Sequence, residues 1–369
     1  MKKFLALLLS MMMVAFSFGA VAEAVDPNTL EDNITAENGV FEIALVTDVG
    51  HLKDGSFNEG TWNGVKLAAN TQGVTYKYYQ PANGNQATDD DRYDAMKAAC
   101  ENGAKIVVAP GFLQAASLTK AATEYPEVKF VFIDGWDLEL DNIAAIAFAE
   151  QESGYMAGYA IVKEGFEKIG FSGGGGGTNP ACCRYGYGFA QGVNAAAKEL
   201  GKTVELKYSW NYGASFSGSP ELQTMISGWY ETGTEIVFAC GGTMFNSITA
   251  AASANDGFVV GVDVDQSTQS ETVVTSAMKD LPAATQWALA KFYNGEWDTI
   301  GNNCAVLGAV DGSTGIPTAT WSFENYTVAE YEAQLASIKD GSLVIDSTVL
   351  ENGAVVNAGL ENVNIIYED

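Results

Sequence analysis

The stretch that decides the fold runs from residue 42 to residue 65 and reads EIALVTDVGHLKDGSFNEGTWNGV. Residues 43–46 are apolar and partly β-branched, which predicts a short buried strand. Glycines and an aspartate in residues 50–55 then break the pattern and predict a loop. We expect Ser56 to cap a helix that begins at Phe57. The stretch is therefore a strand, a polar loop and a helix start.

The same order of strand and helix repeats along the chain. Further strands are expected near residues 74–80, 105–109, 128–133 and 143–148, with helical segments between them. A second series begins with a helix near residue 151 and places strands near residues 168–171, 204–210, 236–239 and 259–262. This spacing is typical of βαβ units. The sequence therefore predicts an α/β protein built from two doubly wound halves, each with a mostly parallel sheet.

The composition excludes some classes of partner. The chain has 369 residues, enough for two domains, and is 47% hydrophobic and 18% charged, as expected for a globular protein. Its formal net charge is −27, from 46 acidic and 19 basic residues. Binding to phosphate backbones requires a basic patch, and none is visible. We expect no nucleic-acid partner.

The first 24 residues predict a secretory signal peptide. Lys2 and Lys3 precede an apolar run over residues 4–16, and residues 20–24 offer small-x-small cleavage sites. No later stretch is long and apolar enough to span a membrane. No cysteine precedes Cys100, so no lipobox cysteine is present. The sequence thus predicts a periplasmic or otherwise extracytoplasmic protein that is secreted across the cytoplasmic membrane without a lipid anchor.

Metal, cofactor and catalytic motifs are not found. The five cysteines show no CxxC or Cys/His ligand spacing, and an odd number leaves at least one without an intramolecular disulfide. The glycines of residues 173–177 lack the Lys-Ser/Thr of a phosphate loop, and instead favour a flexible loop or a close approach of backbone to ligand. The single histidine, His51, has no Gly-x-Ser-x-Gly motif nearby, so we expect an exposed loop residue. We expect no metal, no cofactor and no catalytic residue. In so acidic a chain, however, the spacing of Asp and Glu residues does not exclude a secreted hydrolase with paired carboxylates.

Polar and aromatic residues recur where the expected strands end. In open α/β sheets, ligands bind beyond the carboxyl ends of the strands. Together these residues suggest a cleft that hydrogen-bonds a polar ring while aromatic side chains stack on its faces. They are Asp48, Phe57, Asn58, Asp134, residues 210–216, Gly241, Gly242, Asp263, Ser276 and Lys279.

Two segments carry a specific resemblance to a known family. The first is Thr47-Asp48-x-Gly50 with Asp54-x-Ser56-Phe57-Asn58 and Trp62-x-Gly64, and the second is Gly261-Val262-Asp263-x-Asp265-Gln266. They resemble the basic membrane protein family, substrate-binding proteins of ABC transporters that are related to purine nucleoside receptor lipoproteins. The resemblance covers roughly residues 42–310. The chain departs from the family pattern in its missing lipobox cysteine, an enlarged segment at 173–183 and a long acidic tail.

The resemblance implies a type I periplasmic-binding-protein fold with two lobes joined by three crossovers. The N-terminal lobe is expected over residues 42–148 plus about 264–306, and the C-terminal lobe over 149–263 plus about 307–345. A leader at 25–41 and a tail at 346–369 would flank them. The protein is expected to be a monomer. Its expected partners are a small-molecule ligand, which would be a nucleoside, and an ABC permease.

The resemblance also implies ligand contacts. Phe57 would cover one face of a purine, and Phe216 the other, with Trp210 or Tyr212 as rivals for the second position. Asp134 would bind the purine edge, with Asp48 and Asn58 lining the same lobe.

The sugar of the nucleoside would lie against the second lobe. Asp263 would accept hydrogen bonds from ribose hydroxyls, Lys279 would contact the sugar, and Gly241-Gly242 would let the backbone approach it. A sugar or another small polar solute in the same fold remains the alternative ligand.

Overall fold

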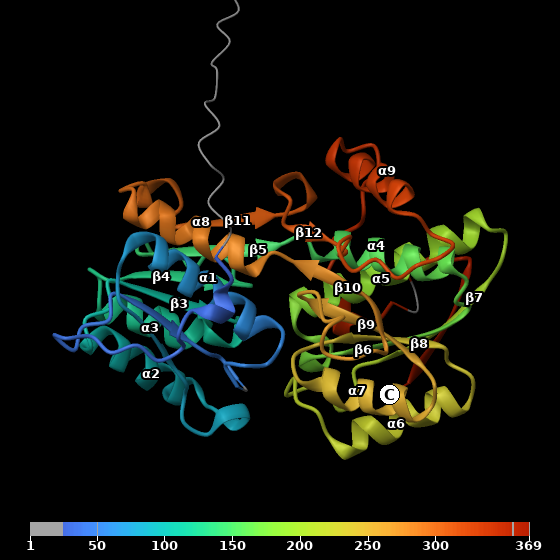
Figure 1. The fold of residues 1–369 in the computed structure, drawn as a ribbon, viewed down its shortest axis with the longest axis horizontal. Coiled ribbons are helices and arrows are strands. Elements are labelled where there is room, and N and C mark those ends of the chain that lie inside the picture. Colours follow the sequence, from blue (N-terminus) through green and yellow to red (C-terminus); the bar gives the residue numbers. More distant parts are fainter. Residues whose placement is uncertain (1–24, 50, 356–357, 369) are drawn as a thin grey trace, which may run out of the picture.

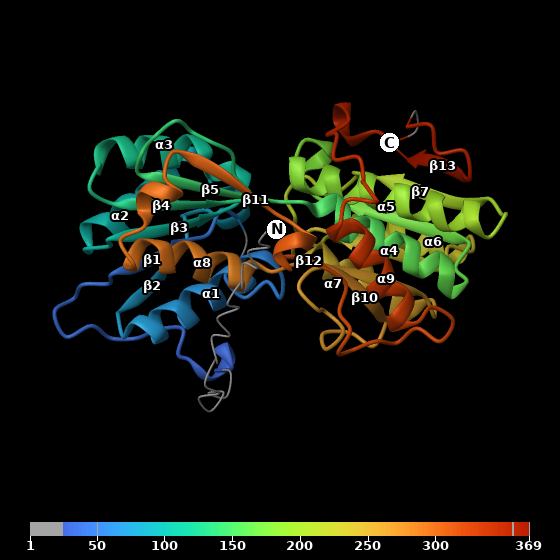
Figure 2. The ribbon, with the colours of Figure 1, turned by 90° about the horizontal axis from the view of Figure 1, so that it is seen from above.

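The computed structural model describes residues 25–368 except residue 50 and residues 356–357, and it shows two lobes side by side (Figures 1 and 2). Each lobe is built on one sheet. The first sheet has the strand order β11-β5-β4-β3-β1-β2, and the second has the order β12-β10-β9-β8-β6-β7-β13. All strand pairs are parallel except β10 with β12. The predicted fold, two parallel-sheet α/β lobes, is confirmed.

The first lobe follows the predicted series of strands and helices closely. Its strands are β1 (Ile43–Val46), β2 (Tyr76–Tyr79), β3 (Ile106–Pro110), β4 (Lys129–Ile133), β5 (Ile143–Phe148) and β11 (Asn303–Leu307). Its helices are α1 (Phe57–Gln72), α2 (Asp89–Glu101), α3 (Ala115–Glu124) and α8 (Leu281–Tyr293).

The continuous apolar run of β1 is explained by helices on both faces of this sheet. Ile43 and Leu45 pack in one core with α1 and α8, whereas Ala44 and Val46 pack in another with α2 and α3. Successive side chains of a strand point to opposite faces, so a strand covered on both sides is apolar throughout.

The second lobe repeats the arrangement. Its strands are β6 (Lys168–Gly173), β7 (Val204–Ser209), β8 (Ile236–Cys240), β9 (Phe258–Asp263), β10 (Val273–Lys279), β12 (Thr314–Gly315) and β13 (Val363–Glu368). Its helices are α4 (Glu150–Glu164), α5 (Pro180–Glu199), α6 (Pro220–Glu231), α7 (Met244–Ala254) and α9 (Val328–Lys339).

Helices α4 and α5 approach each other closely because glycines face the contact. A Cβ atom on Gly188 would lie 2.2 Å from the carbonyl oxygen of Gln151, and one on Gly192 would lie 2.0 Å from that of Tyr155. The sequence predicts a helix from about Gly186 to Leu200, whereas helix α5 begins at Pro180, six residues earlier. Asn179 caps it by accepting a hydrogen bond from the backbone N–H of Cys182.

Three details of the predicted lobe boundaries are wrong. Strand β10 pairs with β9 in the second sheet, so residues 273–279 do not belong to the first lobe. The chain therefore crosses between lobes after β5, between β10 and α8, and after β11 (Figure 1). Strand β13 pairs with β7, so the end of the predicted tail is part of the second lobe. The predicted leader also packs on the first lobe, where Asp32 accepts hydrogen bonds from Trp62 and Lys66.

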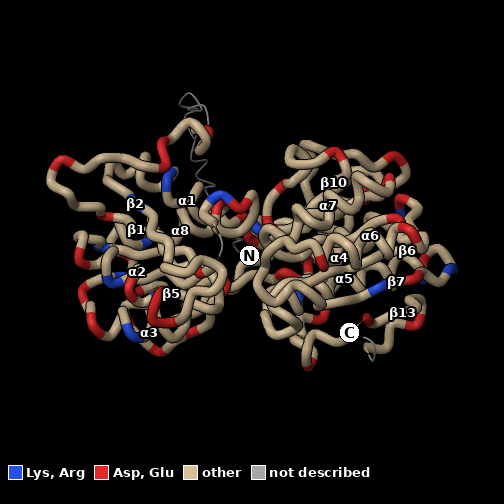
Figure 3. The backbone as a smooth tube through the Cα atoms, turned by 90° about the horizontal axis from the view of Figure 1, so that it is seen from below, with Lys and Arg blue, Asp and Glu red and all other residues tan. Residues whose placement is uncertain are grey.

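Acidic side chains outnumber basic ones on both lobes, consistent with the charge of the chain (Figure 3). Within the described residues, no helix combines the length and the apolar character needed to cross a bilayer. The predicted signal peptide lies outside the described residues.

Candidate ligand-binding site between the lobes

A cavity lies where the carboxyl ends of the two sheets face each other across the lobes. It has a volume of about 660 Å³ including its open mouth. All nine residues predicted to contact ligand line it: Asp48, Phe57, Asn58, Asp134, Phe216, Gly241, Gly242, Asp263 and Lys279.

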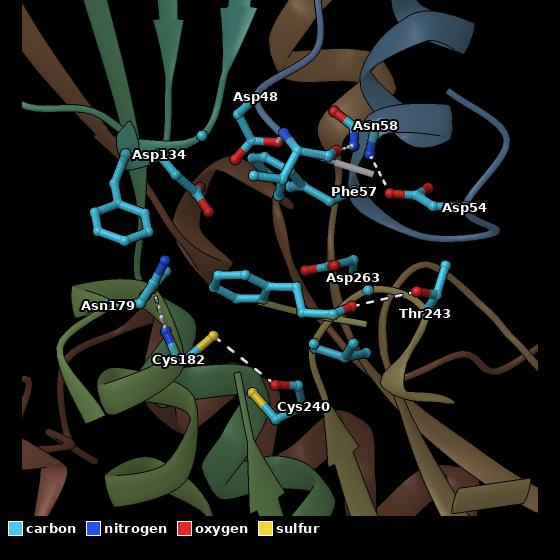
Figure 4. Close-up of a pocket in the computed structure, with 18 of the residues that line it drawn as sticks. Asp48, Asp54, Phe57, Asn58, Asp134, Asn179, Cys182, Cys240, Thr243 and Asp263 are labelled. Atoms are coloured by element: carbon cyan, nitrogen blue, oxygen red, sulfur yellow. Dashed lines mark hydrogen bonds between the residues drawn. The ribbon is translucent and has the colours of Figure 1, made fainter. Parts of the chain in front are cut away.

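The first-lobe wall is held by the loop before α1 (Figure 4). The carboxylate of Asp54 accepts hydrogen bonds from the backbone N–H groups of Ser56, Asn58 and Glu59, at 2.9, 2.9 and 3.1 Å. The predicted capping role of Ser56 is therefore wrong. Ser56 occupies the N-cap position, but its hydroxyl makes no capping bond and donates to Asp263 of the second lobe instead. Asp54 orients Phe57 and Asn58 toward the cavity by fixing the helix start.

Asp48 lies in the same wall beside a glycine that leaves room for it. A Cβ atom on Gly111 would lie 2.0 Å from Oδ2 of Asp48, and Gly111 has φ +103°, so a larger residue is excluded on both counts. Burial raises the pKa of Asp48 to about 7, although the Val49 N–H and Arg92 oppose the shift. Asp48 is therefore a carboxyl group that holds its proton close to neutral pH.

Of the nine predicted residues, three that are not glycine have a left-handed backbone. Asp134, Phe216 and Asp263 have φ values of 56°, 57° and 67°. This region is uncommon for residues other than glycine, and most of all for a bulky side chain such as that of Phe216. Strained backbone of this kind clusters at ligand sites, where the surrounding structure holds it. Asp134 directly follows β4 and Asp263 ends β9, whereas Phe216 lies in the loop between β7 and α6.

Lys279 is the central cation of the cavity. Its ammonium group forms an ion pair with Asp134 of the first lobe and lies 3.6 Å from Oδ1 of Asp263. It also lies 4.7 Å from the centre of the Phe57 ring. Burial disfavours its charge, but the neighbouring carboxylates, Asp134 first, outweigh burial and raise its pKa. The side chain thus links residues from both lobes.

Some buried polar atoms in the cavity wall have no hydrogen-bond partner within the protein. They include Oδ1 of Asn58, Oδ1 of Asp134 and the hydroxyl of Tyr185. Leaving a buried polar group unpaired costs about 1–3 kcal/mol. These atoms are therefore suited to hydrogen-bond a polar ligand.

The two alternative candidates for the second stacking position, Trp210 and Tyr212, lie outside the cavity wall. Trp210 is buried in the second-lobe core and donates its Nε1–H to the carbonyl oxygen of Gly353. Tyr212 is 53% exposed and lies outside this cavity. Ser276 is fully buried and accepts a hydrogen bond from the backbone N–H of Gln266. Of these aromatic candidates, the structure places only Phe216 in the cavity wall.

Sequence reasoning missed part of the lining. Tyr185, Asn179 and Cys182 come from the start of α5, and Cys240 comes from the end of β8. Figure 4 shows Asn179, Cys182 and Cys240 in the cavity wall. The three residues at the start of α5 were missed because α5 begins earlier than predicted. Asn179 followed by Pro180 was the sequence signal for this helix start. His51 is exposed at the mouth of the cavity, and all five cysteines are free.

Comparison with known proteins agrees with this geometry. Residues 41–348 match the profile of the family described as ABC transporter substrate-binding protein PnrA-like. A nucleoside-binding protein of an ABC transporter from Lactococcus lactis is 28% identical over 240 residues, 61% of this chain and 64% of its own length. Basic membrane protein B of Borreliella burgdorferi is 30% identical over 239 residues, 62% and 67% of the two chains. The chain spans a little less than two thirds of the Lactococcus protein.

Solved structures support the fold. A solute-binding protein of an ABC transporter system from Aeropyrum pernix superposes with a TM-score of 0.65 at 24% identity, over 86% of this chain and 92% of the other. An arabinose-binding protein from Geobacillus stearothermophilus superposes with a TM-score of 0.57 at 10% identity, over 77% of this chain and all of the other.

One prediction from the sequence is contradicted by the relatives. The Pyrococcus furiosus protein, 24% identical over 311 residues, is named a lipoprotein, as are relatives from two further Pyrococcus species. The part of the predicted location that excludes a lipid anchor is therefore contradicted by this comparison, whereas the extracytoplasmic part is not.

The family match covers most of the chain and includes both segments on which the resemblance rested. The described fold and the interlobe cavity are those expected of a receptor that encloses a small molecule. The chain belongs to the family of PnrA-like substrate-binding proteins of ABC transporters.

Proposed function

We propose that this protein binds a purine nucleoside between its lobes and delivers it to an ABC permease. The observation that carries the proposal is one cavity lined by a phenylalanine from each lobe, Phe57 and Phe216, together with buried carboxylates. Aromatic rings stack on the faces of a heterocycle, and carboxylates accept hydrogen bonds from its N–H groups and from hydroxyls. The Lactococcus relative is named a nucleoside-binding protein, which supports this ligand class.

We assign the contacts as follows. Phe57 and Phe216 stack on the base, and Asp134 binds the base edge with Asn58 and Asp48 beside it. Asp263 and Lys279 bind the sugar, and the backbone at Gly241-Gly242 approaches it. Two acceptors on neighbouring hydroxyls distinguish ribose from deoxyribose, because a buried acceptor without its donor costs about 1–3 kcal/mol.

We also propose that binding occurs in the monomer without turnover and without nucleic acid. Three of the acidic groups that line the cavity already have partners within the protein. Asp54 caps α1, and Asp134 and Asp263 lie beside Lys279. Chromatography of a nucleoside incubated with the protein tests this part: cleavage to free base and sugar would show a hydrolase.

Identification of the ligand is the direct test. Mass spectrometry of small molecules released from the purified protein is expected to show a nucleoside. Calorimetric titration is expected to give heat with adenosine, guanosine or inosine, and none with ribose or arabinose. If the sugars bind and the nucleosides do not, the proposed ligand is wrong while the family assignment stands.

A further inference from the structure

The two most family-specific segments of the sequence contact each other across the lobes. The hydroxyl of Ser56, in the first lobe, donates a hydrogen bond to Oδ2 of Asp263, in the second, at 2.6 Å. The carbonyl oxygen of Gly55 accepts hydrogen bonds from Nε2 of Gln266 and Nε2 of Gln269, at 3.1 and 2.7 Å. Residues more than 200 positions apart thus form a direct bridge between the lobes.

The second-lobe side of this bridge is held in place before it meets the first lobe. Gln266 is fully buried, and its Oε1 accepts a hydrogen bond from the backbone N–H of Val262 at 2.9 Å. Its own backbone N–H donates to Oγ of Ser276 at 3.1 Å. Because the amide oxygen is used within the second lobe, the amide NH₂ group is the end that points to Gly55.

The first-lobe side is equally constrained. Asp54 fixes the loop through its three backbone N–H partners, and Gly55 has φ +65°. This left-handed φ favours glycine, and a Cβ atom on Gly55 would also lie 2.4 Å from Oε1 of Gln269. The Gly55 N–H in turn donates to Oε2 of Glu59 at 3.0 Å. The carbonyl group of Gly55 is therefore presented toward the second lobe.

Gly55, Gln266 and Gln269 do not line the ligand cavity, whereas Asp263, the partner of Ser56, does. Among the described residues that form its wall, Gly55, Gln266 and Gln269 are absent, whereas Gly55 and Gln269 line a separate surface groove that also runs between the lobes. An effect of these residues on ligand binding would therefore act through the position of the lobes.

We propose that Gly55, Ser56, Gln266 and Gln269 form an interlobe latch that stabilises the closed state and slows ligand release. The hydrogen bonds of the latch join separate lobes, so they form when the lobes are together and are replaced by water when the lobes part. The latch thereby shifts the population toward the closed form, and the apparent affinity rises with that population. The role in ligand release rests on the proposed function, whereas the bias toward closure does not.

Gln269→Glu is the variant that isolates the latch. Gln269 is exposed, so the substitution does not threaten the core, and it replaces the donating NH₂ group by an oxygen of equal size. Gln72→Glu, at the exposed last residue of α1, is the matched control. Stopped-flow measurement with the nucleoside that binds is expected to show an off-rate about three to ten times faster for Gln269→Glu, with little change in on-rate.

Small-angle X-ray scattering of the ligand-free protein provides a second readout that needs no ligand. A larger radius of gyration is expected for Gln269→Glu than for the wild type and for Gln72→Glu. Equal radii would overturn the latch. A changed radius in a protein that binds no nucleoside would refute the proposed function and leave the latch standing.

Discussion

At the residue scale, the cavity gathers side chains whose local backbone is unfavourable. Asp134, Phe216 and Asp263 have left-handed φ values, and Asp48 is buried as a carboxyl group. Such features lower stability and persist when the surrounding structure supports them. They are consistent with a wall arranged for ligand contact, and each can be tested by a single substitution.

Phe57→Ala is expected to weaken nucleoside binding about tenfold to a hundredfold, because base–aromatic stacking contributes about 1–3 kcal/mol. The ring is half-buried at the helix start, so the fold should be retained. Phe41→Ala is the matched control, since Phe41 also has a lysine over its ring, Lys77 at 5.1 Å, but does not line the cavity. Calorimetry that gives equal affinities for the two variants would argue against stacking on Phe57.

The pH dependence of stability is expected to depend on Asp48. Its pKa is about 7 in the folded protein because of burial, and about 3.9 in the unfolded chain. Between these two pH values the folded state binds more protons than the unfolded state. The contribution of Asp48 to folding stability is therefore full below about pH 4 and is lost as the pH rises through 7. Asp48→Asn removes this dependence, of the order of 4 kcal/mol.

Urea unfolding of the ligand-free protein at several pH values measures the effect of Asp48→Asn. Asp54, whose pKa burial raises to about 6, contributes in the same direction and remains in the variant. The stability of Asp48→Asn should therefore still fall with rising pH, but less steeply than in the wild type. Equal slopes would show that Asp48 is ionised throughout this range.

At the scale of elements, glycines decide how closely α4 and α5 pack. These helices cover one face of the second sheet, and α5 carries Asn179, Cys182 and Tyr185 to the cavity. Contact of backbone with backbone at Gly188 and Gly192 sets the position of α5, and therefore part of the cavity wall.

Gly192→Ala is expected to destabilise the protein by about 1–3 kcal/mol, because the added methyl group would overlap the carbonyl oxygen of Tyr155. Gly228→Ala, in α6, is the matched control: its Cβ meets no atom within 4 Å. This control should stabilise the helix by about 0.4–1 kcal/mol. Chemical denaturation distinguishes the variants, and equal effects would contradict the packing argument.

At the scale of the whole molecule, three chain crossings join two lobes whose strand ends face one cavity. Ligand bound there contacts both lobes and stabilises the closed arrangement relative to the open one. The contacts of Lys279 with Asp134 and of Ser56 with Asp263 show that the two lobes also bind each other directly.

A saturating purine nucleoside is expected to raise the unfolding temperature. At a concentration of about 100 times Kd, ligand adds about 2.7 kcal/mol of stability. For a protein of this size the shift is of the order of 5 °C. Differential scanning fluorimetry with arabinose as the control ligand measures it, and a shift with arabinose but not with nucleosides would favour the sugar alternative.

The sequence determined much of the fold because its signals are local. Apolar runs such as Ile43–Val46 are short, bounded by polar or turn-forming residues and separated by helical segments, and that pattern specifies a doubly wound sheet. The residues expected at the cavity, among them Asp134 and Asp263, were predictable for the same reason, since parallel strands bring their carboxyl ends to one edge.

Only the tertiary structure decided which sheet each late strand joins and which side chain meets which. Strand β10 and strand β13 are ordinary strands in sequence, and their pairing with β9 and β7 depends on long-range contacts that no local pattern encodes. The hydroxyl of Ser56 is a plausible helix cap in sequence, but Asp54 satisfies the helix start and Ser56 bonds Asp263 more than 200 residues away. Local sequence preferences determine where helices and strands form. Their arrangement depends on which distant groups pair with each sheet edge and each hydrogen-bonding side chain.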